Sequence, residues 1–254
     1  MLAIMVGFAI ALGVGLTSVG GGSLTTPLLV LVLGLPPALA VGTALAFSAE
    51  LRLLAAPMHL FGRNVRGHCF WPLVAGGLPG LGLGIALLRH FDHLRWSPAV
   101  LVALGIVLMI TGGGSLWAAR APSLKPPLAG VRRRWLALLA LPIGVETGFS
   151  SAGSGAIGVV ALLHLTDLTA AEAVGTNLLF GAVLSLAGGA WSAAWGLLRG
   201  EVLLQLLLGG VPGVLLGQWL SRRLHARHLR TIALTTVLLL GLALVWTGMG
   251  GAGR

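Results

Sequence analysis

Two short segments rich in glycine and serine interrupt long apolar stretches, and their composition suits the binding of an anion. They are Ser18–Ser23 and Ser150–Gly155. A helix that begins just after such a break, near Ser23 or Ala156, would point free N–H groups and the positive end of its dipole into the protein. These donors match the acceptor oxygens of an oxyanion. The alternative is that the glycines only allow close helix packing. The candidate binding residues are Ser18, Gly20, Gly21, Gly22, Ser23, Ser150, Ser151, Gly153, Ser154 and Gly155.

Three further polar residues follow the breaks along the chain. Thr43, Thr176 and Asn177 lie about two turns into the next predicted helix, which places them roughly level with the breaks. Their hydroxyl and amide groups could complete the shell of a bound anion. The alternative is a hydroxyl that bonds back to its own helix.

Three charged residues stand inside apolar segments, where a charge is costly and usually functional. Glu50 and Arg52 are two residues apart on one helix, so they do not face each other. Arg52 could hold a substrate anion. Glu50 and Glu146 could carry protons if burial raises the pKa of their carboxyl groups. The alternative is a structural buried pair, such as Arg52 with Glu146.

The composition places these residues in a membrane protein. Hydrophobic residues make up 57% of the chain, charged residues 9%, and the mean hydropathy is +1.00. Lipid accepts that much apolar surface, and the segments lack the alternation of barrel strands, so the chain is predicted to be all-α. The formal charge of +10 lies largely in short connectors, which indicates membrane orientation and not nucleic-acid binding. The predicted spanning helices are Pro37–Leu60, Phe70–Leu88, Pro98–Ala119, Ala170–Trp195, Val202–Leu220 and Thr231–Thr247.

The chain also resembles itself at an offset of 133 residues. Ala40–Thr43 falls on the identical Ala173–Thr176, and glycines and prolines match along the whole overlap. The sequence therefore predicts two homologous transmembrane repeats, 1–119 and 135–254, joined by a basic cytoplasmic linker, 120–134. Each repeat has an interrupted helix, Leu2–Leu33 or Trp135–Leu165, followed by three transmembrane helices.

Each interrupted helix could cross the membrane once or enter and return as a hairpin. Single crossings divide Lys and Arg 9 to 6 between the two sides, whereas hairpins divide them 11 to 4. The positive-inside rule favours the hairpin. Three full crossings per repeat would then invert the second repeat relative to the first, as in many secondary transporters. The eleven are Arg63, Arg66, Arg120, Lys125, Arg132, Arg133, Arg134, Arg222, Arg223, Arg227 and Arg230, and the four are Arg89, Arg95, Arg199 and Arg254.

The order, spacing and duplication of these motifs resemble the sulfite exporter TauE/SafE family, also called toluene-sulfonate uptake permeases. The residues are Gly20–Gly22 before Pro27–Leu29, then Ala40–Thr43, with the echoes Ala152–Gly155 and Ala173–Thr176. The second copy departs from the first, with Ser154 where the first has Gly21. The resemblance implies a multi-pass permease of the bacterial inner membrane for a small anion, such as a sulfur oxyanion or an organosulfonate.

Other functions fit the residues less well. An intramembrane hydrolase would need a base beside Ser154, and the nearest histidine, His164, lies at a segment end. A passive anion channel is the other alternative. No ATP-binding loop is present, Cys69 is the only cysteine, and no cofactor or metal is expected. Membrane lipid and the anion are the expected partners, and a homodimer is one alternative for the oligomeric state.

Overall fold

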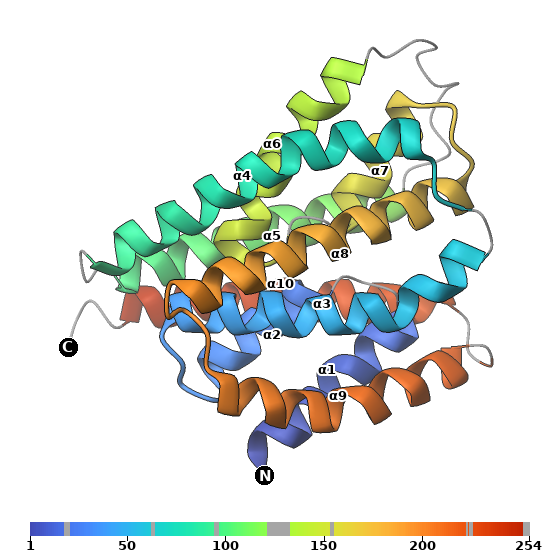
Figure 1. The fold of residues 1–254 in the computed structure, drawn as a ribbon. Coiled ribbons are helices and arrows are strands. Elements are labelled where there is room, and N and C mark those ends of the chain that lie inside the picture. The colour runs from blue at the N-terminus through green and yellow to red at the C-terminus, as the bar shows by residue number, and fades with distance from the viewer. Residues whose placement is uncertain are drawn as a thin grey trace.

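All regular structure in the described part of the chain is α-helical (Figure 1). The computed structural model describes residues 1–17, 21–61, 64–93, 97–120, 133–152, 155–221, 223 and 226–250. Within these residues the helices are α1 (Leu2–Thr17), α2 (Gly21–Leu31), α3 (Pro37–Phe61), α4 (Gly67–His93), α5 (Ser97–Arg120), α6 (Arg133–Ser150), α7 (Ala156–Leu165), α8 (Ala170–Ala194), α9 (Gly200–Ser221) and α10 (Ala226–Gly250).

Six of the described helices, α3, α4, α5, α8, α9 and α10, are long and apolar enough to cross a membrane. The helices α1, α2 and α6 are apolar but shorter. Hydropathy places all six long helices correctly, although several extend beyond the predicted apolar core. Thus Phe70–Leu88 lies inside Gly67–His93, because polar end residues continue a helix without adding to its hydropathy. The prediction of an all-α polytopic membrane protein is confirmed.

Local signals explain where two of these helices stop and start. The α8 helix begins after Thr169, which forms a capping box with Glu172. The same helix is followed by a glycine with positive φ, Gly196 at +72°, and the N–H of Leu197 bonds back to the carbonyl oxygen of Ser192 at 2.7 Å. This tight turn lets α9 begin at Gly200, shortly after α8 ends.

Glycine ridges bring α9 against α1 and α4 against α6. A Cβ atom on Gly213 would overlap the carbonyl oxygen of Phe8, at 2.6 Å, and one on Gly80 would overlap that of Leu141. In each pair, glycines later in one helix contact residues later in the other helix, so the two helices run parallel. The α9 to α1 pairs are Gly209 with Ile4, Gly213 with Phe8 and Gly217 with Leu12, and the α4 to α6 pairs are Gly76 with Ala137, Gly80 with Leu141 and Gly84 with Val145.

The helices α3 and α8 cross in opposite directions, and so do α5 and α10. Gly189 packs against Ala46, while Gly175, near the start of α8, packs against Asn64 beyond the end of α3. These directions define two ends of the molecule. At the terminal end, α1, α3 and α9 begin and α10 ends; at the linker end, α4, α6 and α8 begin and α5 ends. In Figure 1 α3 and α9 begin on the left and α4 and α8 on the right, while α1 begins at the bottom and α6 at the top.

The two interrupted segments return to the end of the molecule from which they start. The α1 helix begins at the terminal end, because it is parallel to α9, and α2 finishes beside the start of α3 at that same end. The α6 helix begins at the linker end, because it is parallel to α4, and α7 finishes beside the start of α8. The turn from α1 to α2 is called the first tip below, and the turn from α6 to α7 the second tip.

Candidate functional site

The first and second tips meet inside the protein. The hydroxyl group of Ser151 donates to the carbonyl oxygen of Gly22 at 3.0 Å. The Oγ1 atom of Thr26 lies 2.7 Å from the same Ser151 oxygen. Because the Ser151 proton is already used, Thr26 is the donor in this second bond. All three residues are buried, so the structure brings together the two breaks that the sequence singled out.

The second tip is shaped by hydroxyl side chains. Ser151 has a φ of +64°, in the left-handed region, and its N–H donates to the carbonyl oxygen of Thr147 at 2.8 Å. A left-handed residue at this place ends a helix, a role that glycine usually fills. Ser150 donates through its hydroxyl group to the carbonyl oxygen of Glu146 at 2.9 Å. These bonds satisfy the Ser151 N–H and the Ser150 hydroxyl group where α6 ends.

The first tip requires glycine at the start of α2. A Cβ atom on Gly22 would overlap the carbonyl group of Ser151, which would separate the two tips. A Cβ atom on Gly21 would instead lie 3.2 Å from Leu51 and 3.4 Å from the hydroxyl oxygen of Ser48, both on α3. The backbone at the N-terminus of α2 therefore lies directly against a polar side chain of α3.

That side of α3 carries two buried polar groups without partners in the described part of the chain. Ser48 is 0% exposed and its hydroxyl oxygen makes no hydrogen bond. Arg52, one turn later on the same face, is 9% exposed and its Nε atom is likewise unpartnered. The sequence alone did not identify Ser48, although its spacing of four residues from Arg52 is the signal that could have found it.

The acidic residues differ from one another in their surroundings. Glu146 is partly buried, and its Oε1 atom is buried without a hydrogen-bond partner. It forms no ion pair with Arg52; the one ion pair between described residues joins Arg66 and Glu172. The structural pair considered above is therefore absent. Glu50 has an exposed side chain, because its position faces away from the α2 side of α3, so the burial on which its proton role depended is not found.

Asn177 holds the second tip together. Its amide nitrogen donates to the carbonyl oxygen of Gly155 at 2.9 Å, just before α7 begins. A Cβ atom on Gly158, in the first turn of α7, would overlap the amide oxygen of the same side chain. The amide thus packs against the N-terminal turn of α7, the helix start at which the sequence predicts a bound anion.

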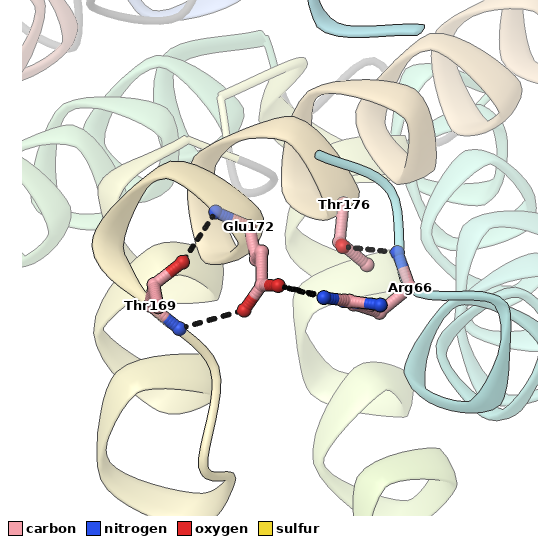
Figure 2. Close-up of polar contacts among 4 residues, drawn as sticks. All are labelled: Arg66, Thr169, Glu172 and Thr176. Carbon is pink, nitrogen blue, oxygen red and sulfur yellow. Dashed lines mark hydrogen bonds and ion pairs between the residues drawn. The ribbon is translucent and has the colours of Figure 1, made fainter. Parts of the chain in front are cut away.

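The two threonines bind the ends of the molecule and not its tips. The N–H of Arg199 donates to the Thr43 hydroxyl oxygen at 3.2 Å at the terminal end. The N–H of Arg66 donates to the Thr176 hydroxyl oxygen at 3.0 Å at the linker end (Figure 2). Each hydroxyl oxygen thus accepts an N–H group from the other half of the chain, and the part of both threonines in an anion shell stays a prediction.

The linker end carries an additional ion pair, shown in Figure 2. Arg66 donates through Nε to the Glu172 carboxylate at 2.7 Å, and its Nη2 atom contacts the same oxygen. The other carboxylate oxygen of Glu172 accepts the N–H of Thr169 at 2.9 Å. The residue 133 positions before Glu172 is Leu39, so the terminal end has no counterpart of this pair.

The remaining predicted residues are placed as follows. Gly21, Gly22, Ser23, Ser150 and Ser151 lie at the two tips, and so does Gly155. No group of three potential metal ligands occurs among the residues that the structure describes. Four predicted site residues, Ser18, Gly20, Gly153 and Ser154, lie outside the described residues, as does most of the predicted linker.

The helices and their two meeting tips define a multi-pass membrane protein with polar groups enclosed among its helices. Comparison with known proteins agrees: the sequence profile of the family described as "Sulfite exporter TauE/SafE" matches residues 3–244. The chain therefore belongs to the TauE/SafE family of membrane transporters, which are not enzymes.

Two bacterial relatives illustrate the similarity. The "Probable membrane transporter protein YjnA" of Bacillus subtilis (strain 168) is 32% identical over 253 residues, which cover 95% of this chain and 98% of the relative. A "Probable membrane transporter protein" of Xylella fastidiosa (strain Temecula1 / ATCC 700964) is 31% identical over 237 residues, 89% of this chain and 85% of the relative. No solved structure gives a significant match.

Proposed function

We propose that the protein is a secondary transporter that moves a small anion across the bacterial inner membrane. The observation that carries this proposal is Arg52, a cation nine-tenths buried among membrane-length helices with no partner in the described part of the chain. An unpaired buried cation is strongly disfavoured and calls for an anionic ligand. The name of the matching family, sulfite exporter, supports a sulfur oxyanion or an organosulfonate as that ligand.

The transporter is built, in this proposal, from two inverted repeats, 1–119 and 135–254. The support is that contacts recur at the same offset of 133 residues with the two halves exchanged. Gly80 packs on Leu141 as Gly213 packs on Phe8. The N–H of Arg66 bonds Thr176 as the N–H of Arg199 bonds Thr43. Gly77 packs on the ring of Phe180 as Gly210 packs on that of Phe47, and a Cβ atom added to either glycine would lie 2.6 Å from the ring. Such exchange is what a two-fold axis between inverted halves produces.

The linker end is proposed to face the cytoplasm. The connections between helices at that end include eleven Lys and Arg residues in the sequence, against four at the terminal end. Both chain termini then face the periplasm. A reporter enzyme fused to the C-terminus that is active only in the cytoplasm should be silent, while the same reporter inserted in the linker should be active. An active C-terminal fusion would refute this orientation.

Glu146 is proposed to couple transport to protons. Its buried Oε1 atom has no hydrogen-bond partner among the residues that the structure describes, and the residue lies one turn before the second tip. A carboxyl group in this position can be neutral in one state of the cycle and charged in another. Glu50 is the second predicted carrier, and its exposure makes it the natural comparison.

The test is flux in sealed proteoliposomes with an imposed pH gradient, with sulfite and methanesulfonate as probes. The wild type should accumulate at least one probe against its concentration gradient, and Glu146→Gln should abolish accumulation while binding persists. Glu50→Gln is expected to retain more activity. Equilibration without accumulation would indicate a passive channel. Normal accumulation by both variants would refute the coupling role.

A further inference from the structure

The two tips differ in the residues that face their helix N-termini. Three positions of α8 correspond, at the offset of 133, to Ala44, Ser48 and Arg52 of α3. They are Asn177, Gly181 and Ser185. The α3 side therefore carries a hydroxyl group and a cation, whereas the α8 side carries an amide and the buried hydroxyl group of Ser185 but no charge. The halves of the chain pack alike at the tips but do not offer the same chemistry there.

A side chain of the protein packs against the first turn of α7. The amide of Asn177 bonds the carbonyl oxygen of Gly155 at 2.9 Å, and its oxygen rests on Gly158. A ligand in this position would have to displace a side chain that is 5% exposed. The corresponding residue of α3, Ala44, is too small to cover the start of α2 in the same way.

The N-terminus of α2 is instead faced by groups that lack partners. Ser48 points its hydroxyl oxygen to within 3.4 Å of a Cβ position on Gly21, the first residue of α2. The first backbone N–H groups of any helix have no acceptor within the helix. Arg52 lies one turn from Ser48 and directly follows Leu51, whose side chain lies 3.2 Å from the same Cβ position on Gly21. The Ser48 hydroxyl group and the Arg52 Nε atom, two buried donors without partners among the described residues, thus lie on the face of α3 that adjoins the start of α2.

We infer that the transported anion binds on one side only, between the N-terminus of α2 and the Ser48–Arg52 face of α3, while Asn177 closes the equivalent place at α7. This inference rests on the proposed function. It assigns Ser48 as a substrate ligand and removes Asn177 from the binding residues. The oxyanion accepts from the guanidinium group, from the Ser48 hydroxyl group and from the first N–H groups of α2.

The experiment measures binding of sulfite and methanesulfonate to the purified full-length protein by calorimetry. Loss of a hydrogen bond to a charged ligand costs about 1.5–3 kcal/mol, so Arg52→Gln should raise the Kd about 10- to 100-fold, with partial recovery in Arg52→Lys. Ser48→Ala should raise it about three- to tenfold. The matched control is Ser192→Ala, which removes another buried hydroxyl group without a partner, on α8 beside Gly42; its Kd should stay within about twofold.

Two further measurements make the result decisive. Asn177→Ala should bind within about threefold of the wild type, because its amide serves α7 and not the ligand. Without ligand, Arg52→Gln should unfold at a higher temperature than the wild type, since it removes an uncompensated buried charge, and it should lose the stabilisation that each probe confers.

Each outcome has one meaning. If the wild type binds a probe and both Ser48→Ala and Arg52→Gln bind it equally well, the one-sided site is overturned and the proposed function stands. A loss in Asn177→Ala as large as that in Ser48→Ala would also overturn it. A folded wild type that binds and transports neither probe would overturn the proposed function and this inference together.

Discussion

Replacing Gly22 by alanine tests whether the contact between the two tips holds the centre of the fold. The added Cβ atom would lie 2.6 Å from the carbonyl carbon of Ser151 and 2.9 Å from its hydroxyl oxygen, where ordinary contact needs at least 3.4 Å. Both nearest groups belong to backbone or to a short side chain, so neither can rotate away. The carbonyl carbon alone would require the tips to separate by about 0.8 Å, the difference between 3.4 and 2.6 Å, and the carbonyl oxygen of Ser151, which overlaps the added atom outright, requires more.

The expected loss in the free energy of unfolding combines the cost of overpacking with the hydrogen bonds that the separation would break. Overpacking in a tight interior costs about 1–3 kcal/mol. The hydrogen bonds of Ser151 to Gly22 and Thr26 would lengthen beyond useful range, at about 1 kcal/mol each. We therefore expect Gly22→Ala to lower the free energy of unfolding by about 3–5 kcal/mol, a shift of about 6–20 °C in Tm for a chain of this size.

The neighbouring residue supplies the control. A Cβ atom on Gly21 meets only the end of the Leu51 side chain at 3.2 Å and Ser48 at 3.4 Å. Since both can shift slightly, Gly21→Ala should unfold within about 1 kcal/mol of the wild type and yet bind the anion less tightly. The assay is thermal unfolding in a mild detergent, followed by tryptophan fluorescence. Equal stability of the two variants would refute the reasoning.

Three other substitutions have definite expected outcomes in the same unfolding assay. Ser151→Gly should be more stable than Ser151→Ala by about 1–2 kcal/mol, because both lose the hydroxyl group but only glycine relieves the φ of +64°; equal stabilities would contradict this. Glu172→Ala should lower the Tm through loss of the capping box and of the Arg66 pair, and Glu172→Gln should lower it less, since glutamine can still cap; a larger loss in the glutamine variant would be inconsistent with the capping role. Gly76→Ala should cost about 1–3 kcal/mol by pushing α4 from Ala137, whereas Gly114→Ala, which meets nothing within 4 Å, should be neutral or slightly stabilising; similar losses in both would show that close packing is not the reason.

The sequence was sufficient to predict the elements that hydropathy and glycine encode. Six spanning helices, two broken segments and the starts of α3 at Pro37 and of α8 at Ala170 follow from apolar length, proline and capping residues. The return of each broken segment was favoured by charge alone, and the parallel packing of α1 on α9 agrees with it. These features are local or statistical, so a single sequence reveals them.

The details of the site depend on which side of a helix faces which neighbour, and periodicity is weak evidence for this in helices that are apolar all round. Thr43 and Thr176 are level with the breaks by helix rise but bond to helix ends. Glu50 and Arg52 are close in sequence, yet one is exposed and the other buried. Ser48 is inconspicuous in a serine-containing apolar helix until its hydroxyl group is seen beside Gly21.

The parallel pairs also have a consequence for how the protein is made. As the chain leaves the ribosome, α4 presents its glycine ridge before α6 has been synthesised, and α1 must wait for α9, which begins at Gly200. The helices α1 and α6, the longer parts of the two interrupted segments, therefore each pack most closely on a helix from the other half of the chain. A chain cut between residues 121 and 132 would therefore leave two fragments with unmatched glycine ridges, and both would have to be produced in the same membrane to assemble.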